Sequence, residues 1–284
     1  PIADPVCVPV YYVSKLAREN GVTVSQVGEG ADELFWGYPS WKDSLNLQKT
    51  LDTPLGMLAP LGAWGLQQTG RSYGRKYEML RRRAANNKVF WGGAESFYET
   101  YKKQLLSPRL RQHFKGRTSW EVLEPIHQRY QEKAWEKSTL HWMSYLDLNF
   151  RLPELLLMRV DKMSMGVSLE ARVPFLDHEF VELALSIPEA MKTKNGTLKY
   201  MLKKAVRGVI PDELIDRPKQ GFGVPIHEWL SQRLGDVIKD ELESFCKETD
   251  YLDWEVVSAL VDSRGASSSW FLFNLALWWK EYIR

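Results

Sequence analysis

Acidic residues and glycines share a short segment near the start of the chain, Gly28-Glu29-Gly30-Ala31-Asp32-Glu33. The β-branched run before it, residues 22–27, predicts a buried strand, and the two glycines allow the sharp turn that follows. Residues 31–35 then predict a helix start, whose free N–H groups and positive dipole end attract an anion such as phosphate. Three carboxylates repel a polyphosphate unless a cation lies between them, so the segment predicts a site for Mg-ATP.

The same residues also have a purely structural explanation. Acidic residues in a first turn stabilise any helix through its dipole, and two glycines one residue apart occur in many turns. The residue types alone leave both interpretations open.

Two distant stretches carry cations that can serve such a site. Arg159 and Lys162 lie three apart on one flank of a predicted helix, where they can bind an anion together or pair with Asp161 at the surface. Lys219 lies just before the glycine-rich residues 221–223. It is interpreted either as an exposed cation that binds phosphate or as an ordinary solvated lysine. The predicted helix that carries Arg159 and Lys162 also has an apolar flank, which is expected to face the core. This flank consists of Leu156, Val160, Met163 and Val167.

The scaffold that positions these residues is predicted to be mostly helical. Residues 8–19 have helical spacing and lead to the strand at 22–27, one unit of a parallel sheet. No second alternating run follows, so its partner strands are expected upstream of Pro1. Prolines and glycines crowd residues 51–71 and predict a loop. Helices are predicted over residues 41–51, 76–87, 94–106, 121–137, 140–150, 153–167, 178–185, 197–209, 211–215, 226–234, 236–246, 254–263 and 267–282.

The predicted fold class is therefore mainly α with a remnant of a parallel α/β sheet. One domain covers residues 1–284, with an α/β edge over residues 1–50 and helices over residues 51–284. The basic residues within 71–88 point around a helix and predict a solvated one, and the aromatic stretch 270–279 predicts packing. Three charged residues are predicted to form a buried scaffold around Pro174, namely Glu170, Arg172 and Asp177.

Composition restricts the partners. Of 284 residues, 44% are apolar and 26% are charged, and the net charge is +2. This balance predicts a globular protein that binds neither nucleic acid nor a membrane, and no run approaches the ~18 apolar residues of a membrane span. Two cysteines without metal-site spacing suit a reducing cytoplasm. Since the chain begins at Pro1 without a targeting segment, we expect a cytoplasmic piece of a longer protein.

All three stretches resemble motifs of the asparagine synthetase family. Residues 28–38, Gly-Glu-Gly-Ala-Asp-Glu-Leu-Phe-Trp-Gly-Tyr, resemble its G-E-G-A-D-E-L-F-G-G-Y motif. Residues 158–178 resemble its R/K-x-D-R/K-M-S-M…S-L-E-A-R-V-P-F-L-D-H segment, and the loop around Lys219 is spelled nearly as in the family. The likeness spans essentially the whole chain. It implies the C-terminal portion of a synthetase domain with the adenine-nucleotide alpha-hydrolase-like (HUP) fold.

The resemblance also implies a reaction. ATP would activate a carboxylate, aspartate in the type enzymes, as an acyl-adenylate, and ammonia derived from glutamine would attack it to give asparagine, AMP and pyrophosphate. By motif position, Asp32 would hold Mg²⁺, Glu29 would deprotonate or position the amine, and Lys219 would contact phosphates as pyrophosphate leaves. An N-terminal glutaminase domain would supply the ammonia. Whether the protein forms a homodimer is left open by the resemblance. The nucleotide and substrate pocket would be formed by Gly28, Gly30 and Arg159.

Departures from the family pattern keep alternatives open. The family's S-G-G-x-D-S pyrophosphate loop and its glutaminase domain are absent from the sequence, so this chain by itself is expected to be inactive. Val27 stands where the family usually has serine, and Trp36 where it has glycine. Another carboxylate, as in relatives that amidate sugar precursors or close lactams and peptides, is therefore an alternative to aspartate. A non-catalytic helical interaction module is the second alternative.

Overall fold

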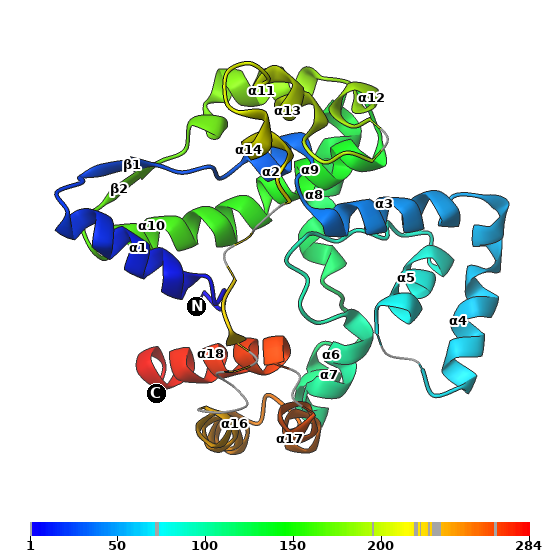
Figure 1. Cartoon of the computed structure of the whole chain (residues 1–284). Coiled ribbons are helices and arrows are strands. Elements are labelled where there is room, and N and C mark those ends of the chain that lie inside the picture. Colours follow the sequence, from blue (N-terminus) through cyan, green and yellow to red (C-terminus); the bar gives the residue numbers. More distant parts are fainter. Residues whose placement is uncertain are drawn as a thin grey trace.

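The structure is a computed structural model that describes residues 2–71, 74–194, 196–218, 221, 223–226, 228, 234–263 and 266–284. It is mostly helical, with two short strands at one edge (Figure 1). No helix among the described residues is both long and apolar enough to cross a bilayer. The elements in chain order are α1 (Cys7–Glu19), β1 (Val24–Gln26), α2 (Ala31–Phe35), α3 (Pro39–Leu51), the 3-10 helix η1 (Pro54–Leu58), α4 (Ala59–Gln68), α5 (Arg75–Ala84), α6 (Glu99–Leu105), α7 (Pro108–His113), α8 (Trp120–Lys133), α9 (Thr139–Asn149), the π-helix η2 (Leu152–Leu157), α10 (Met158–Met165), β2 (Glu170–Arg172), the 3-10 helix η3 (Pro174–Leu176), α11 (His178–Ser186), α12 (Glu189–Lys192), α13 (Tyr200–Ala205), α14 (Asp212–Asp216), α16 (Gly235–Thr249), α17 (Trp254–Asp262) and α18 (Ala266–Tyr282).

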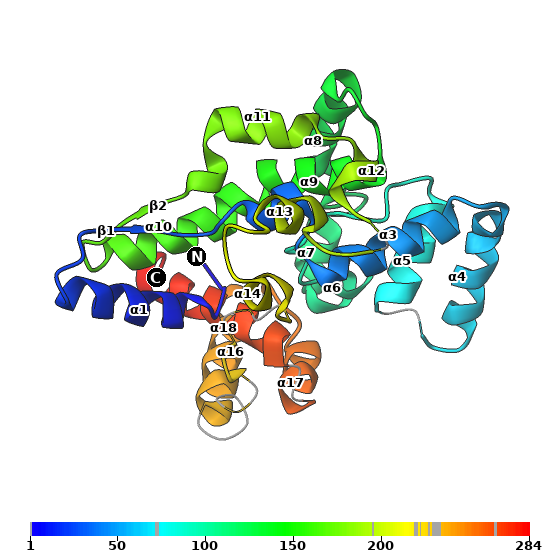
Figure 2. The same ribbon diagram turned by 45° about the horizontal axis from the view of Figure 1, so that its top comes forward.

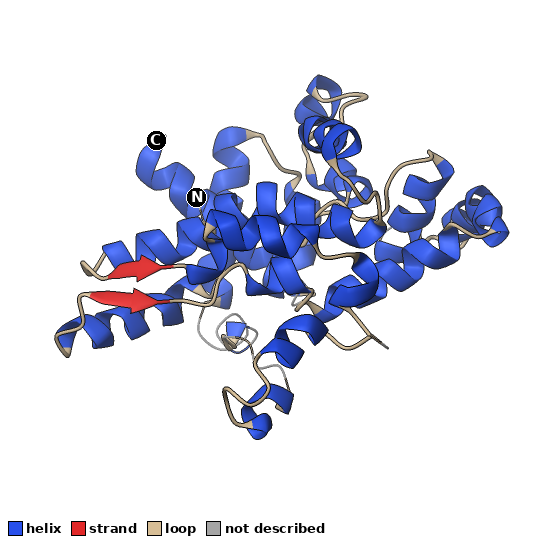
Figure 3. Ribbon diagram, turned by 90° about the horizontal axis from the view of Figure 1, so that it is seen from above, coloured by secondary structure: helices blue, strands red, loops and turns tan. Residues whose placement is uncertain are grey.

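The predicted strand at residues 22–27 is present as β1, and one partner strand lies downstream, where the sequence predicted none. β1 lies parallel to β2, with Val24 opposite Glu170 and Gln26 opposite Arg172 (Figure 3). A strand of three residues is too short to show alternation, so β2 left no periodic signal in the sequence. Val24 is 40% exposed, so the prediction of a buried strand is also wrong for the described residues.

The charged residues near β2 are not the buried scaffold that the sequence predicted. The side chains of Glu170 and Arg172 are 55% and 64% exposed, and they pair with each other at 2.7 Å. Asp177 instead caps α11, because its Oδ1 accepts hydrogen bonds from the backbone N–H groups of Glu179 and Phe180 at 3.1 and 3.3 Å. Side-chain capping of free helix N–H groups needs no burial.

One segment that was predicted as a loop is helical in the structure. Residues 51–71, predicted as a loop, form η1 and α4, and α4 packs along α5. Pro60 lies in the first turn of α4, where a missing N–H costs nothing, and Gly62 lets the side chain of Leu80 approach. The predicted helix over 226–234 lies largely outside the described residues.

The C-terminal helices form a packed group of their own. α16, α17 and α18 contact one another, and α17 also contacts α6 (Figure 1). Leu272, Phe273 and Ala276 of α18 are buried in this group, which confirms packing as the role of the aromatic stretch 270–279. A second buried cluster, which is rich in tryptophan, joins α3, α8 and α9 and contains Trp41 and Trp142.

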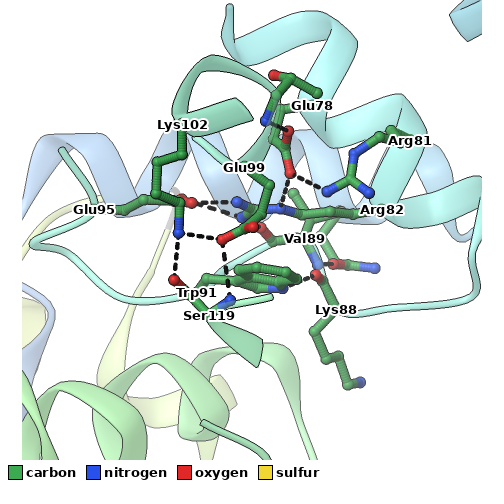
Figure 4. Close-up of polar contacts among 12 residues, drawn as sticks. Glu78, Arg81, Arg82, Lys88, Val89, Trp91, Glu95, Glu99, Lys102 and Ser119 are labelled. Atoms are coloured by element: carbon green, nitrogen blue, oxygen red, sulfur yellow. Dashed lines mark hydrogen bonds and ion pairs between the residues drawn. The ribbon is translucent and has the colours of Figure 1, made fainter. Parts of the chain in front are cut away.

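One arginine of the basic stretch is buried, although the sequence predicted a solvated helix. Arg82 on α5 is 1% exposed. Its guanidinium binds Glu78 at 3.1 Å, the Val89 carbonyl at 2.9 Å and Glu95, and it lies 3.8 Å above the ring of Trp91 (Figure 4). A buried guanidinium is stable only when its donors are satisfied in this way, so Arg82 joins α5 to the segment after it.

Lys192, at the end of α12, is fully buried, and among the described residues its Nζ has no hydrogen-bond partner. Burial lowers the pKa of this amine from its usual 10.5 to about 8, and the charge of Glu136 only partly opposes that shift. Below pH 8 the folded protein therefore holds a buried ammonium group, whereas the unfolded chain exposes it to water.

Replacing Lys192 with methionine is expected to raise the free energy of unfolding at pH 7 by about 2 kcal/mol, since it removes the buried charge. The folded-state pKa is lowered, so wild-type stability should rise between pH 8 and 10.5 as the folded protein releases this proton before the unfolded chain does. The variant should lack that rise. Urea unfolding at pH 7 and pH 10 measures both effects. Lys194→Met, at an exposed position two residues later, is the control; a loss of stability at pH 7 in Lys192→Met would contradict the prediction.

Candidate active site

A cavity of about 720 Å³ lies where β1 ends and α1 packs on α10. The segment after β1 contributes Gly28, Glu29 and Asp32 to its wall, and α10 contributes Arg159. Four of the six residues predicted from the sequence therefore line one cavity. Lys219 lies outside the described residues.

Arg159 joins two carboxylates from distant parts of the chain. Its Nη1 lies 2.6 Å from Asp4 Oδ2, and its Nη2 lies 2.7 Å from Glu29 Oε1. The side chain of Arg159 is only 10% exposed. Burial disfavours the charged guanidinium, but the charges of Asp4 and Glu29 outweigh it and raise the pKa of Arg159 above its usual value. This array differs from the predicted pairing with Asp161, because Asp4 and Glu29 are close to Arg159 only in the folded chain.

Asp32 is held by a lysine that the sequence analysis did not single out. Lys199, just before α13, places its Nζ 2.9 Å from Asp32 Oδ1, and its backbone N–H donates to the Trp36 carbonyl at 3.3 Å. Gly37 makes room for this pair, because a Cβ there would lie 1.5 Å from the Asp32 oxygen. Lys199 also has a φ of +52°, which is uncommon for a residue with a side chain. No sequence pattern marked this residue.

A buried layer lies behind Asp32. Glu33 is 1% exposed, and burial raises the pKa of its carboxyl. The hydroxyl of Tyr38 donates to Glu33 Oε1 at 2.5 Å, and the guanidinium of Arg151 lies 4.4 Å above the Tyr38 ring. Tyr38 and Arg151 both reach the cavity wall, so this layer connects the cavity to the core.

The helix after the turn is present at the predicted residues, as α2, but it is only five residues long. Since the macrodipole needs several aligned peptide units, the predicted anion attraction of this helix start is weak. Gly30 has a φ of +92° and does not line the cavity; a Cβ there would lie 2.4 Å from Leu176. Its role is therefore to let the turn pack on η3. Gly28 does face open space where a Cβ would stand.

The two departures from the family motif lie in different surroundings. Val27 lines the cavity, whereas Trp36 is 4% exposed and packs in the tryptophan-rich cluster with Trp41 and Leu45. Trp36 is therefore part of the core and is not among the residues that line the cavity with Glu29 and Asp32.

Trp36→Gly is accordingly expected to lower the free energy of unfolding by about 2–4 kcal/mol. Losing a buried tryptophan side chain costs about 3–5 kcal/mol, and glycine recovers about 1 kcal/mol because Trp36 has a φ of +62°. Urea unfolding measures the loss. The preference among carboxylic acids in a pyrophosphate-exchange assay should stay the same, and a changed preference would show that the ring does act on the substrate.

The oxygen ligands that the cavity wall offers are too few to hold a magnesium ion by themselves. No group of three or more His, Cys, Asp or Glu side chains that could hold a metal occurs among the described residues. Asp32 offers one carboxylate at the cavity wall, and Lys199 already pairs with its Oδ1. Mg²⁺ in nucleotide sites is commonly held by one or two carboxylates with phosphates and water, so Asp32 fits an ion that shares its ligands with a nucleotide.

Comparison with known proteins decides the family. The Asparagine synthase family model matches residues 1–280. The chain belongs to the asparagine synthase family. It is 32% identical over 98% of its length to "Asparagine synthetase [glutamine-hydrolyzing] 1" of Bacillus subtilis. It is 34% identical over 84% of its length to a putative glutamine-hydrolysing asparagine synthetase of Mycobacterium tuberculosis. The chain spans 43% and 35% of the length of these two relatives.

Proposed function

We propose that this family member carries the carboxylate-activating site of an ATP-dependent amide ligase. The observation that supports this most is that Glu29, Asp32 and Arg159 line the same cavity at the end of β1. Family membership supports ATP-dependent amidation in general. The HUP fold for the synthetase part, a cytoplasmic location and a homodimer belong to the same proposal.

The proposed reaction has two steps. An oxygen of the substrate carboxylate attacks the α-phosphorus of ATP, and the bond to pyrophosphate breaks, which gives an acyl-adenylate. Ammonia then attacks the acyl carbon, AMP leaves, and a proton from nitrogen is released. We propose that this proton passes to Glu29, whose carboxylate is paired with Arg159 at the cavity wall.

Cations at the cavity would handle the phosphates. Asp32 would hold Mg²⁺, which, when bound, neutralises phosphate charge. The ammonium of Lys199 pairs with the same carboxylate, 2.9 Å from its Oδ1, and Lys199 is not among the residues that line the cavity. Lys219 is proposed, from its motif position, to contact the leaving pyrophosphate. A cation placed in advance stabilises charge that builds up in the transition state more than the ground state.

We propose L-aspartate as the first candidate substrate and ammonia from glutamine as the amine donor. The names of the two relatives call them glutamine-hydrolysing asparagine synthetases. A glutaminase domain would then act with this chain in the full-length protein. Val27 at the cavity wall, in place of the usual serine, favours testing other carboxylic acids beside aspartate.

The deciding experiment is isotope exchange between pyrophosphate and ATP, measured with the native gene product that contains this chain. Aspartate, glutamate and a panel of other carboxylic acids are supplied one at a time. Exchange that depends on one carboxylate supports the activation step and identifies the substrate. A folded protein without exchange on any acid would contradict the proposal and favour the non-catalytic helical module.

A further inference from the structure

Five large apolar side chains project into solvent from η1 and α4. They are between 55% and 79% exposed and are called the α4 patch here: Leu55, Met57, Leu58, Leu61 and Trp64. Leu58, Leu61 and Trp64 succeed one another at helical spacing of three residues, so they share one side of the helix. An apolar patch of this kind on a soluble protein usually marks an interaction surface.

The opposite side of α4 is already in use. Ala59 is 2% exposed, and the Cβ position of Gly62 lies 3.2 Å from Leu80 on α5. α4 therefore packs on α5 with one face and presents a second apolar face outward. A helix that is apolar all round is normally covered on all sides, so the outward face is expected to have a binding partner.

The charges around the α4 patch are mostly positive, and exposed Asp52 is the one acidic residue between Lys49 and Lys76. Residues 53–77 contain no aspartate or glutamate. Lys49 precedes η1, and Arg71, Arg75 and Lys76 follow α4; all four are exposed, and none forms an ion pair within the described residues. The partner is therefore expected to carry negative charge, because uncompensated cations repel a positive surface.

The shape of the region favours a flat partner. α4 lies at the outer end of the molecule, remote from β1 and β2, in both views (Figures 1 and 2). None of the described cavities includes a residue of the α4 patch. Anchor side chains of protein partners usually enter pockets, and none of the four described cavities lies at this projecting surface. A symmetric contact between two copies would also bring the same cations together.

We propose that the α4 patch docks onto an anionic membrane surface. Leucine and tryptophan side chains would enter the boundary between head groups and acyl chains, while the flanking lysine and arginines meet lipid phosphates. The sequence-based expectation of no membrane partner rested on net charge and the lack of a span. Neither property bears on a helix that lies in the interface, where a local patch is sufficient.

Vesicle flotation of the full chain tests this proposal. We expect the protein to float with vesicles of phosphatidylglycerol and phosphatidylcholine in equal parts at low salt, and to float much less with phosphatidylcholine alone or in 0.5 M salt. The double variant Leu61→Ser/Trp64→Ser should bind anionic vesicles at least about tenfold more weakly. Arg71→Glu/Lys76→Glu should remove the preference for anionic lipid.

Controls separate a local effect from unfolding. Val209→Ser alters an exposed apolar residue outside the α4 patch, at 78% exposure, and should float like the wild type. Circular dichroism checks that each variant is folded. Absence of flotation with anionic vesicles, or flotation unaffected by Leu61→Ser/Trp64→Ser, would overturn the proposal. Self-association in sedimentation that the same double variant abolishes, without flotation, would also overturn it and assign the patch to a second copy.

Discussion

Arg159→Met is expected to lower the free energy of unfolding by about 3–5 kcal/mol. Arg159 is one-tenth exposed and lies between Asp4 and Glu29, at 2.6 and 2.7 Å. Removing Arg159 leaves the carboxylates of Asp4 and Glu29 partly buried without a counter-charge. The resulting loss of stability is much larger than the net stability that the intact ion pairs contribute. Urea unfolding at pH 7 measures the change.

The matched control is Arg172→Met on β2. Its guanidinium pairs with Glu170 at the same 2.7 Å, but the side chain is 64% exposed. A solvated pair contributes little, so this variant should lose less than about 1 kcal/mol. Adding Glu29→Gln to Arg159→Met should recover part of the loss, because one stranded charge disappears. Equal effects at Arg159 and Arg172 would show that Asp4, Arg159 and Glu29 are not a buried unit.

Asp32→Asn is expected to lower the rate of carboxylate-dependent pyrophosphate exchange by about 10²–10³-fold, or about 2.7–4 kcal/mol of transition-state stabilisation. The amide keeps the size of the side chain but loses the charge that would hold Mg²⁺. The loss of unfolding free energy should be smaller than in Arg159→Met, since the side chains of Asp32 and Lys199 are about one-quarter exposed and that of Arg159 is one-tenth exposed. A large kinetic effect together with this smaller stability effect is the expected signature.

Gly37→Ala provides an independent test of the same carboxylate. The added Cβ would lie 1.5 Å from Asp32 Oδ1 and 2.3 Å from Lys199 Cε, so both side chains must move. The rate of pyrophosphate exchange in Gly37→Ala should fall, although this substitution removes no charge. Asp43→Asn, at an exposed position on α3, is the control for a general loss of acidic charge. A normal exchange rate in Asp32→Asn would remove Asp32 from the proposed mechanism.

The sequence predicted the local elements of the site well. The strand near residues 24–26, the turn at Gly28 and Gly30, and the helix at residues 31–35 are each determined by a few neighbouring residues. The apolar flank of η2 and α10 was recognisable in part, because Leu156 and Val160 recur at helical spacing and are buried, whereas Met163 and Val167 are half-buried. Such short-range patterns follow from backbone and side-chain geometry within one element.

Contacts between distant residues could not be predicted in the same way. β2 is too short to show alternation, and it became visible only through its pairing with β1. Asp4 is 155 residues from Arg159, and Lys199 is far from Asp32 along the chain. α4 was obscured by its glycines and prolines, which are tolerated because α5 packs against it.

By itself, the sequence determined the family, the helical class and the acidic turn that follows the first strand, since these depend on residue types at short and regular spacing. Only the tertiary structure decided that Arg159 binds Glu29, that Lys199 holds Asp32, and that Trp36 faces the core. The physical reason is that burial and ion pairing depend on distances through space, and chain folding sets those distances independently of separation along the sequence.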